Sequence, residues 1–218
     1  MGWLRLLFLA LIAKPVARVF TGADVIGAEH LPRTGPAIVA ANHNSHVDTL
    51  LLLTIFPVRS LRRVRPAAAA DYFLKGPLIG WFSRHIIGIV PIKRDGGARD
   101  RVRAGEDVLA PAREALTQGD IVIVFPEGTR GDASDELGQL KNGVARLAEA
   151  FPDAPVTPVW IQGAGRVLPK GGMIPVPMNC CVLVGEPIRW QGRRTQFMDS
   201  LRDALAALKA QAPPLRWS

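Results

Sequence analysis

The run Ile121-Val122-Ile123-Val124-Phe125 is the strongest strand signal in this chain of 218 residues. It consists of β-branched and aromatic residues, which strands favour. Both of its faces are apolar, and this is typical of a strand that lies inside a sheet with helices packed on both sides. We therefore expect residues 120–125 to form a central, buried strand.

The sequence on either side of this run alternates short β-branched segments with segments of helical periodicity, separated by Gly and Pro. This alternation predicts an α/β fold. Further strands are expected at residues 24–26, 37–41, 65–69, 87–92, 156–161 and 179–185. Helices are expected at about residues 46–55, 76–82, 99–117, 142–150 and 194–210.

No internal repeat or linker interrupts residues 21–218, so we expect one domain there, with a mostly parallel or mixed central sheet flanked by helices. Hydrophobic residues make up 48% of the chain, which excludes disorder, collagen-like repeats and a small disulfide scaffold. The formal net charge of +8 favours anionic partners, namely nucleic acid, phospholipid surfaces or phosphorylated substrates.

Cys180 and Cys181 are adjacent in an expected strand, and we expect two buried, reduced thiols in a cytosolic setting.

Residues 1–20 form a basic, apolar segment without an acidic residue. Its longest uninterrupted apolar run, Leu6–Ala13, is far shorter than the about 20 residues that span a bilayer. Lys14 and the proline after it interrupt the place where a signal peptide would be cleaved, so we do not expect cleavage. We expect an interfacial helix on an anionic membrane, with Arg5, Lys14 and Arg18 facing the head groups; ordinary packing on the domain is the alternative.

Polar side chains crowd the loop after the expected strand at residues 37–41, where the sequence reads Asn42-His43-Asn44-Ser45-His46-Val47-Asp48. Ser45 and Asp48 have the spacing of a helix capping box, which explains both without catalysis. The capping box does not explain His43. If His43 and Asp48 were both helical, they would lie about 140° apart, but with His43 in the loop they can meet. A carboxylate on one imidazole nitrogen leaves the other to accept a proton from a hydroxyl, so we predict a His43–Asp48 dyad.

The sequence offers no convincing side-chain nucleophile for this dyad. It contains no Gly-x-Ser-x-Gly elbow, and Ser45 is explained as a cap. We therefore expect direct attack by a substrate hydroxyl. A metal site built from His43, His46 and Asp48 is the alternative, but the chain has no zinc-type spacing and its two other histidines lie in unpromising contexts, so we expect no metal and no cofactor.

The strongest strand ends in Phe125-Pro126-Glu127-Gly128-Thr129-Arg130, and the carboxyl ends of such strands are where α/β sheets bind ligands. Gly128 lets the backbone approach an anion, Thr129 offers a hydroxyl, and the planar fork of Arg130 matches phosphate oxygens. A plain β-turn explains the same residues when they are taken alone.

A second basic segment, Gly88–Arg94, ends an expected strand with two adjacent cations. Arg94 is a candidate for another phosphate contact. A solvated basic edge that discourages strand pairing is the alternative.

Together these segments resemble the lysophospholipid acyltransferase family, whose best-known members are the bacterial 1-acylglycerol-3-phosphate acyltransferases. The family's Asn-His block, with Asp five residues after the His, stands at Asn42–Asp48, and its glycine-led strand ending in Arg resembles Gly88–Arg94. Its Phe-Pro-Glu-Gly-Thr-Arg block is complete at Phe125–Arg130, and its Val-Pro-Val-type strand resembles Val156–Val159. The resemblance covers about residues 25–188.

The resemblance implies transfer of a fatty acyl group from acyl-CoA or acyl carrier protein to the hydroxyl of a lysophospholipid, first of all 1-acylglycerol-3-phosphate, which gives phosphatidic acid in phospholipid biosynthesis. It implies that His43 is the general base and Asp48 its orienting partner. The residues implied to hold the acceptor phosphate are Arg94, Glu127, Gly128, Thr129 and Arg130. With the N-terminal segment, it implies a peripheral or monotopic protein at the cytoplasmic side of the cell membrane.

One departure from the family concerns residues 70–71, where many members carry a Lys and this chain has Ala70 and Asp71. This leaves room for another lysolipid or a lipid alcohol as acceptor. Two hypotheses from other functional classes remain. The first is a hydrolase that uses the same dyad with water as the nucleophile, and the second is a noncatalytic module that binds lipid or nucleic acid. The sequence has no nucleic-acid-binding signature, so we expect no nucleic acid partner.

Overall fold

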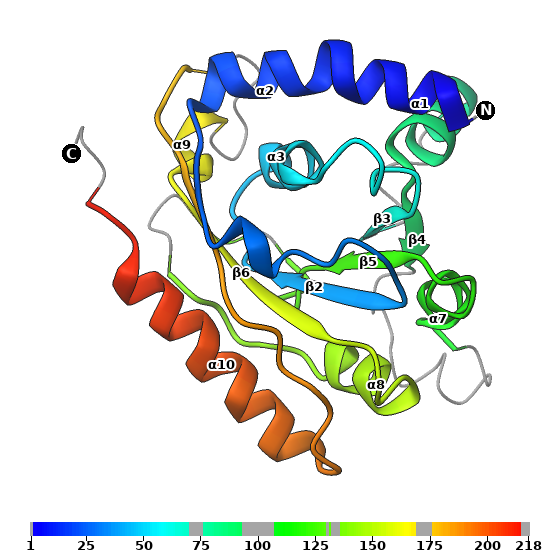
Figure 1. The fold of residues 1–218 in the computed structure, drawn as a ribbon, viewed down its shortest axis with the longest axis vertical. Coiled ribbons are helices and arrows are strands. Elements are labelled where there is room, and N and C mark those ends of the chain that lie inside the picture. The colour runs from blue at the N-terminus through cyan, green and yellow to red at the C-terminus, as the bar shows by residue number, and fades with distance from the viewer. Residues whose placement is uncertain are drawn as a thin grey trace.

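The computed structural model describes residues 2–69, 76–92, 107–129, 131, 136–168 and 176–214. Within these residues the strands form one seven-stranded sheet in the order β1-β7-β6-β2-β5-β3-β4 (Figure 1). The strands are β1 (Asp24–Ile26), β2 (Ala37–Ala41), β3 (Val64–Ala69), β4 (Val90–Ile92), β5 (Ile121–Val124), β6 (Val156–Gln162) and β7 (Cys181–Val184). All neighbouring strands run parallel except β6 and β7, so the expected mostly parallel, mixed sheet is confirmed.

Strand β5 lies between β2 and β3, near the middle of the sheet. Because side chains alternate along a strand, Ile121 and Ile123 join the core on one face, while Val122 and Val124 join the core on the other. All four are buried, which confirms the two-sided burial expected from their sequence.

Helices cover both faces of the sheet (Figure 1). One face carries the N-terminal helix, which consists of α1 (Gly2–Phe8), η1 (Leu9–Ala13) and α2 (Lys14–Thr21), together with α3 (His46–Ile55) and α9 (Ala164–Val167). The other face carries α7 (Ala110–Thr117), α8 (Gly143–Ala150) and α10 (Arg194–Gln211). The remaining described helices are η2 (Ala28–His30), α5 (Pro77–Phe82) and η3 (Ser83–Ile87).

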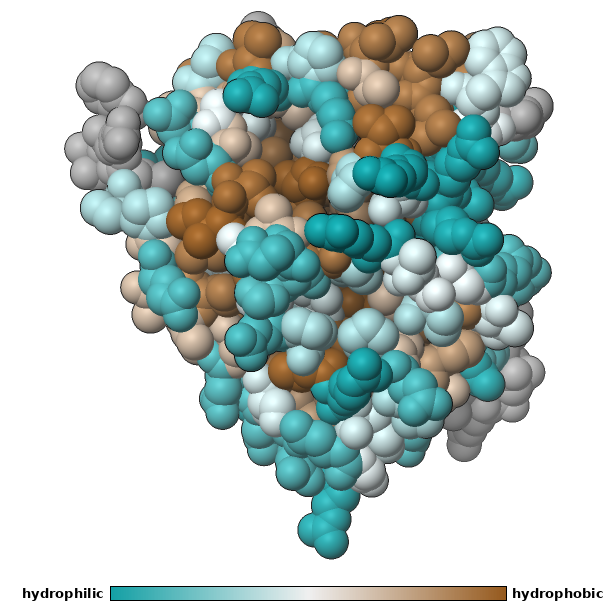
Figure 2. Space-filling model, viewed as in Figure 1, coloured by the Kyte–Doolittle hydropathy of each residue, from teal (hydrophilic) through white to brown (hydrophobic). Residues whose placement is uncertain are grey.

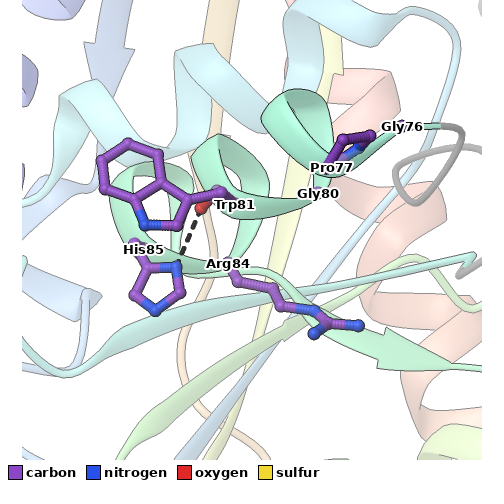
Figure 3. A pocket seen from close by; sticks show the side chains of 6 residues that line it. All are labelled: Gly76, Pro77, Gly80, Trp81, Arg84 and His85. Atoms are coloured by element: carbon purple, nitrogen blue, oxygen red, sulfur yellow. Dashed lines mark hydrogen bonds between the residues drawn. The ribbon is translucent and has the colours of Figure 1, made fainter.

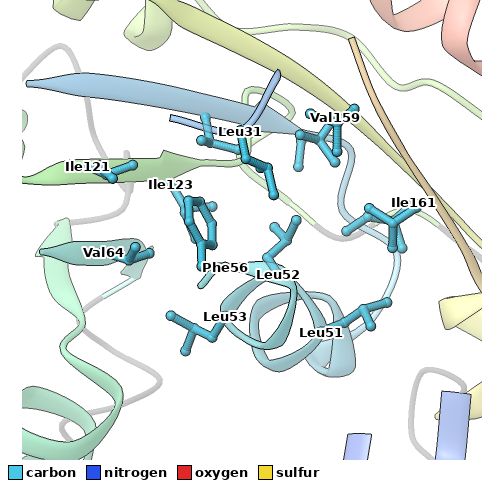
Figure 4. Packing of buried hydrophobic residues seen from close by; sticks show 14 of the residues in the cluster. Leu31, Leu51, Leu52, Leu53, Phe56, Val64, Ile121, Ile123, Val159 and Ile161 are labelled. Atoms are coloured by element: carbon cyan, nitrogen blue, oxygen red, sulfur yellow. The ribbon is translucent and has the colours of Figure 1, made fainter. Parts of the chain in front are cut away.

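Helix α3 is the central support of the first face (Figure 4). Leu52, Leu53 and Phe56 are fully buried against residues of β3, β5 and β6. Burying side chains of this size stabilises a fold by about 1.5–3 kcal/mol each. The helix begins directly after the polar loop at residues 42–45, so this packing also fixes the loop from which the site is built.

The N-terminal helix packs on the domain through every fourth residue: Arg5, Leu9, Ala13, Ala17 and Thr21 are buried. The expectation that Arg5 and Lys14 face lipid head groups is wrong. Arg5 donates hydrogen bonds to backbone carbonyls inside the protein, and Lys14 Nζ donates to the Phe56 carbonyl at 2.8 Å. Arg18 is exposed. Among the described helices, none combines the length and apolarity needed to cross a bilayer.

Most expected elements agree with the structure to within two residues at each end, but two begin at least three residues later than expected. The strand expected at residues 87–92 begins only at Val90, because residues 83–87 form η3, which ends at Gly88 with φ 77°. The helix expected at residues 99–117 begins at Ala110 within the described residues, and residues 99–106 lie outside them. The adjacent thiols are buried as expected, with Cys180 in one core cluster and Cys181 in another.

Candidate active site

The polar loop after β2 and the turn after β5 lie at the same edge of the sheet. The two strands are parallel neighbours, with Ala40 opposite Val124, so their carboxyl ends coincide. His43 follows β2 by two residues, and Phe125 follows β5 directly. This brings together two segments that are 84 positions apart in sequence.

His43 and Asp48 meet as predicted: His43 Nδ1 lies 3.0 Å from Asp48 Oδ2. The same oxygen accepts the backbone N–H groups of Asn44 at 2.6 Å and Ser45 at 2.8 Å. The capping box at Ser45 and Asp48 is therefore present as well. The Asp48 carboxylate thus caps helix α3 and also contacts the imidazole, so its role in the capping box is compatible with a role in the dyad.

The contact decides which imidazole nitrogen is available. An ionised carboxylate can only accept hydrogen bonds, so in the neutral imidazole this contact favours the tautomer with the hydrogen on Nδ1 and the lone pair on Nε2. The Asp48 side chain is fully buried, whereas 17% of the His43 side chain is exposed. In this arrangement a buried carboxylate orients a partly exposed imidazole, which is compatible with a general base.

The segment after β5 makes three contacts with His43, two with its backbone and one with its ring. Glu127 Oε1 accepts the His43 backbone N–H at 3.0 Å, and the Gly131 N–H donates to the His43 carbonyl at 2.8 Å. The Phe125 ring stacks on the imidazole with 4.0 Å between centroids and 22° between planes. The orientation of the imidazole therefore depends on this segment as well as on Asp48.

Glu127 was expected to contact the acceptor, but both of its carboxylate oxygens accept backbone N–H groups, from His43 and, at 3.1 Å, from Gly138. The side chain is buried. Burial raises the pKa of Glu127, and the hydrogen bonds from His43 and Gly138 act in the opposite direction. In this structure Glu127 thus joins three backbone segments.

Asn42 fixes the other side of the loop. Its buried amide donates to the Ile161 carbonyl at 2.8 Å and accepts the Ile161 N–H at 2.6 Å, so it acts as an additional backbone unit between β2 and β6. Together with Glu127 it anchors the backbone on both sides of the Asn42–His43 peptide.

The expected anion site is described in part. Gly128 has φ 70°, a conformation that favours glycine, and Gly128 and Thr129 are exposed. Lys141 lies against this turn, because a Cβ added at Gly128 would meet Lys141 Nζ at 2.8 Å. Arg94 and Arg130 lie outside the described residues. No group of three His, Cys, Asp or Glu side chains placed to hold a metal ion occurs within the described ranges.

A model of the family described as Acyltransferase matches residues 22–162, which include both segments of this site. The chain belongs to the acyltransferase family. It is similar to the chloroplastic 1-acyl-sn-glycerol-3-phosphate acyltransferase BAT2 of Brassica napus, with 32% identity over 70% of this chain and 40% of that protein. It is also similar to the 1-acyl-sn-glycerol-3-phosphate acyltransferase of Bacillus subtilis, with 28% identity over 83% of this chain and 81% of that protein.

Among solved structures, the acyltransferase fold of this chain matches the crystal structure of the 1-acyl-sn-glycerophosphate acyltransferase PlsC from Thermotoga maritima. The TM-score is 0.69 at 26% identity, over 94% of this chain and 80% of that one. The chain spans about two fifths of the length of the chloroplastic relatives of Brassica napus and Arabidopsis thaliana.

Sequence reasoning assigned no site role to three residues of this acyltransferase, namely Asn42, Phe125 and Lys141. For Phe125 and Asn42 the signal was available, since each is the first residue of a motif block at the end of a strand. For Lys141 no local pattern announces the contact, because Lys141 reaches the turn only through the fold.

Proposed function

We propose that this chain transfers a fatty acyl group from a thioester of coenzyme A or acyl carrier protein to the free hydroxyl of a lysophospholipid. The observation that carries the proposal is the 3.0 Å contact between His43 Nδ1 and Asp48 Oδ2. The preferred acceptor is 1-acylglycerol-3-phosphate, with phosphatidic acid as product. The names of the relatives from Brassica napus and Bacillus subtilis support this acceptor.

In the proposed reaction His43 Nε2 takes the proton of the acceptor hydroxyl while the oxygen attacks the thioester carbonyl carbon. The carbon–oxygen bond forms, and the tetrahedral intermediate then loses the thiolate as the carbon–sulfur bond breaks. The imidazolium returns its proton to the sulfur, so the enzyme ends in its starting state. Asp48 stabilises the imidazolium and keeps the ring aligned.

The acceptor phosphate is proposed to bind at the turn after β5. Gly128 and Thr129 are exposed there, and Lys141 lies against Gly128, so the turn offers a backbone approach, a hydroxyl and a cation. Arg94 and Arg130 remain proposed phosphate contacts. Because the chain has Ala70 and Asp71 where the family resemblance leads us to expect a Lys, another lysolipid or a lipid alcohol is the second acceptor to test.

The protein is further proposed to work at the cytoplasmic side of the cell membrane as a peripheral or monotopic enzyme. In support, the outer side of the N-terminal helix exposes Trp3, Leu7, Leu11 and Val19, with exposed fractions between 47% and 72%. An apolar outer side of this kind is typical of helices that lie in the membrane interface.

The test is thiol release from an acyl thioester by the purified protein, measured with and without lysolipid. Release that depends on 1-acylglycerol-3-phosphate, with phosphatidic acid as product, is the expected result. Release without an acceptor would instead establish a hydrolase. No release with any acceptor in a panel of lysolipids would contradict the proposal.

A further inference from the structure

Helix α5 exposes an unusual amount of apolar side chain. Of its six residues, Leu78 is 83% exposed, Ile79 56%, Trp81 44% and Phe82 38%. Scattered apolar residues are normal on a surface, but a contiguous group of large ones indicates an interaction site.

This group is continuous with the outer side of the N-terminal helix. The rings of Phe8 and Phe82 meet edge to face, with 5.2 Å between centroids. Trp3, Leu7 and Leu11 are exposed on α1 and η1. In Figure 2 apolar side chains gather over the N-terminal helix, most densely toward α1.

Arg5 connects the N-terminal helix to η3, which directly follows α5. From the buried side of α1 its guanidinium donates to the carbonyls of Ile86 at 3.2 Å and Ile87 at 3.0 Å, at the end of η3. Gly88 makes room for it, because a Cβ there would lie 2.7 Å from Arg5 Nη2. Burial lowers the pKa of Arg5 to about 10, so the group remains charged at neutral pH.

The charges around the exposed apolar group identify its partner. Residues 2–21 and 76–92 contain no acidic residue, while Arg18 and Arg84 are exposed on them. Within residues 2–21 and 76–92, an apolar surface that carries exposed cations and no acidic residue fits the boundary between acyl chains and anionic head groups, where Trp side chains also favour the interface. A protein partner would require no such one-sided charge.

A pocket beside α5 adds a polar edge to this surface (Figure 3). It has a volume of about 410 Å³ and is lined by Gly76, Pro77, Gly80, Trp81, Arg84 and His85. His85 stacks on Trp81, with its Nδ1 3.0 Å from the Trp81 carbonyl, and Arg84 is exposed. Trp81 belongs both to this pocket and to the exposed apolar group, whereas neither His43 nor Asp48 lines the pocket.

We propose that α5 and the N-terminal helix form a single membrane-docking surface, in which Leu78, Ile79, Trp81 and Phe82 enter an anionic bilayer together with Trp3, Leu7 and Leu11. Arg84 and Arg18 lie at the level of the head groups. This inference rests on the proposed function, since an enzyme that acts on a lysophospholipid must reach a substrate held in a membrane.

The test compares L78S/I79S with Ile26→Ser in co-sedimentation with phosphatidylglycerol vesicles. Ile26 is the matched control because it is 51% exposed but lies on β1, at the opposite edge of the sheet from β4. The L78S/I79S variant should lose at least tenfold in vesicle affinity, and Ile26→Ser should bind like the wild type. Arg84→Gln should reduce the preference for phosphatidylglycerol over phosphatidylcholine vesicles.

Activity on a short-chain, monomeric lysophosphatidic acid separates docking from chemistry. L78S/I79S should keep wild-type turnover there and lose it only with acceptor embedded in vesicles. Vesicle binding by L78S/I79S that equals that of the wild type would overturn the inference. The inference would also be overturned if the wild-type protein did not bind vesicles but formed a dimer that the L78S/I79S substitutions dissociate. If the wild type does not acylate even the monomeric acceptor, the proposed function fails, and the vesicle result still decides the docking surface.

Discussion

At the residue scale, the dyad makes the strongest prediction. His43→Ala removes the proton acceptor, and Asp48→Asn removes the charge that stabilises the imidazolium. Each should lower kcat by about a hundred- to ten-thousand-fold in the thioester assay. The Asn side chain keeps an oxygen for the backbone N–H groups at the start of α3, so circular dichroism should show both variants folded. Turnover like that of the wild type in His43→Ala would refute the mechanism.

Glu127 makes a second prediction, because its two oxygens hold the backbone at His43 and Gly138. In Glu127→Gln an amide NH₂ faces one of these N–H donors, so His43 shifts. Small displacements of catalytic groups are costly, and kcat should fall by about tenfold to a hundredfold while the acceptor KM stays close to that of the wild type.

Thr129→Val is the matched control for Glu127→Gln, since Thr129 lies in the same turn but is exposed. It should raise the acceptor KM and spare kcat. The reverse pattern in Glu127→Gln, with a raised KM and an unchanged kcat, would assign Glu127 to the acceptor site, as its motif had suggested.

At the element scale, Arg5 connects the N-terminal helix to η3. Arg5→Met leaves several buried carbonyls without a donor, and such groups cost about 1–3 kcal/mol each. The free energy of unfolding in urea should therefore fall by at least about 2 kcal/mol. Arg18→Met on the same helix is the control, because Arg18 is exposed and surface changes usually stay within about 0.5 kcal/mol. Equal stability of the two variants would contradict the role assigned to Arg5.

At the scale of the whole molecule, the N-terminal helix is part of the core. Leu9 and Ala13 are almost fully buried in the same cluster as Val39 and Ile123. Deleting residues 2–21 should therefore lower the melting temperature and increase the binding of a hydrophobic dye. A truncated chain that melts cooperatively at the wild-type temperature would show that the helix is dispensable for the fold. Substitutions on its outer side are for this reason the cleaner test of membrane binding.

Features that depend on neighbours along the chain could be predicted from the sequence. The bounds of β1, β2 and α3 agree with the expected ones, because alternation, helical spacing and a capping box are local patterns. The contact of His43 with Asp48 was predictable for the same reason, since both belong to one loop and the first turn of one helix. The prediction that a strand begins at Ile87 was wrong. The β-branched residues at this point form the end of a π-helix, so the local pattern was misleading.

The partners of Arg5 and Glu127 could not be predicted from the sequence, because they depend on how the chain folds in space. Arg5 bonds to a carbonyl 81 positions away, and Glu127 accepts an N–H 84 positions away. An arginine in an apolar helix and a glutamate in a turn both predict exposure when they are judged by their neighbours in sequence. Each is buried because packing brings several backbone groups to it, and no local pattern records where those groups will lie.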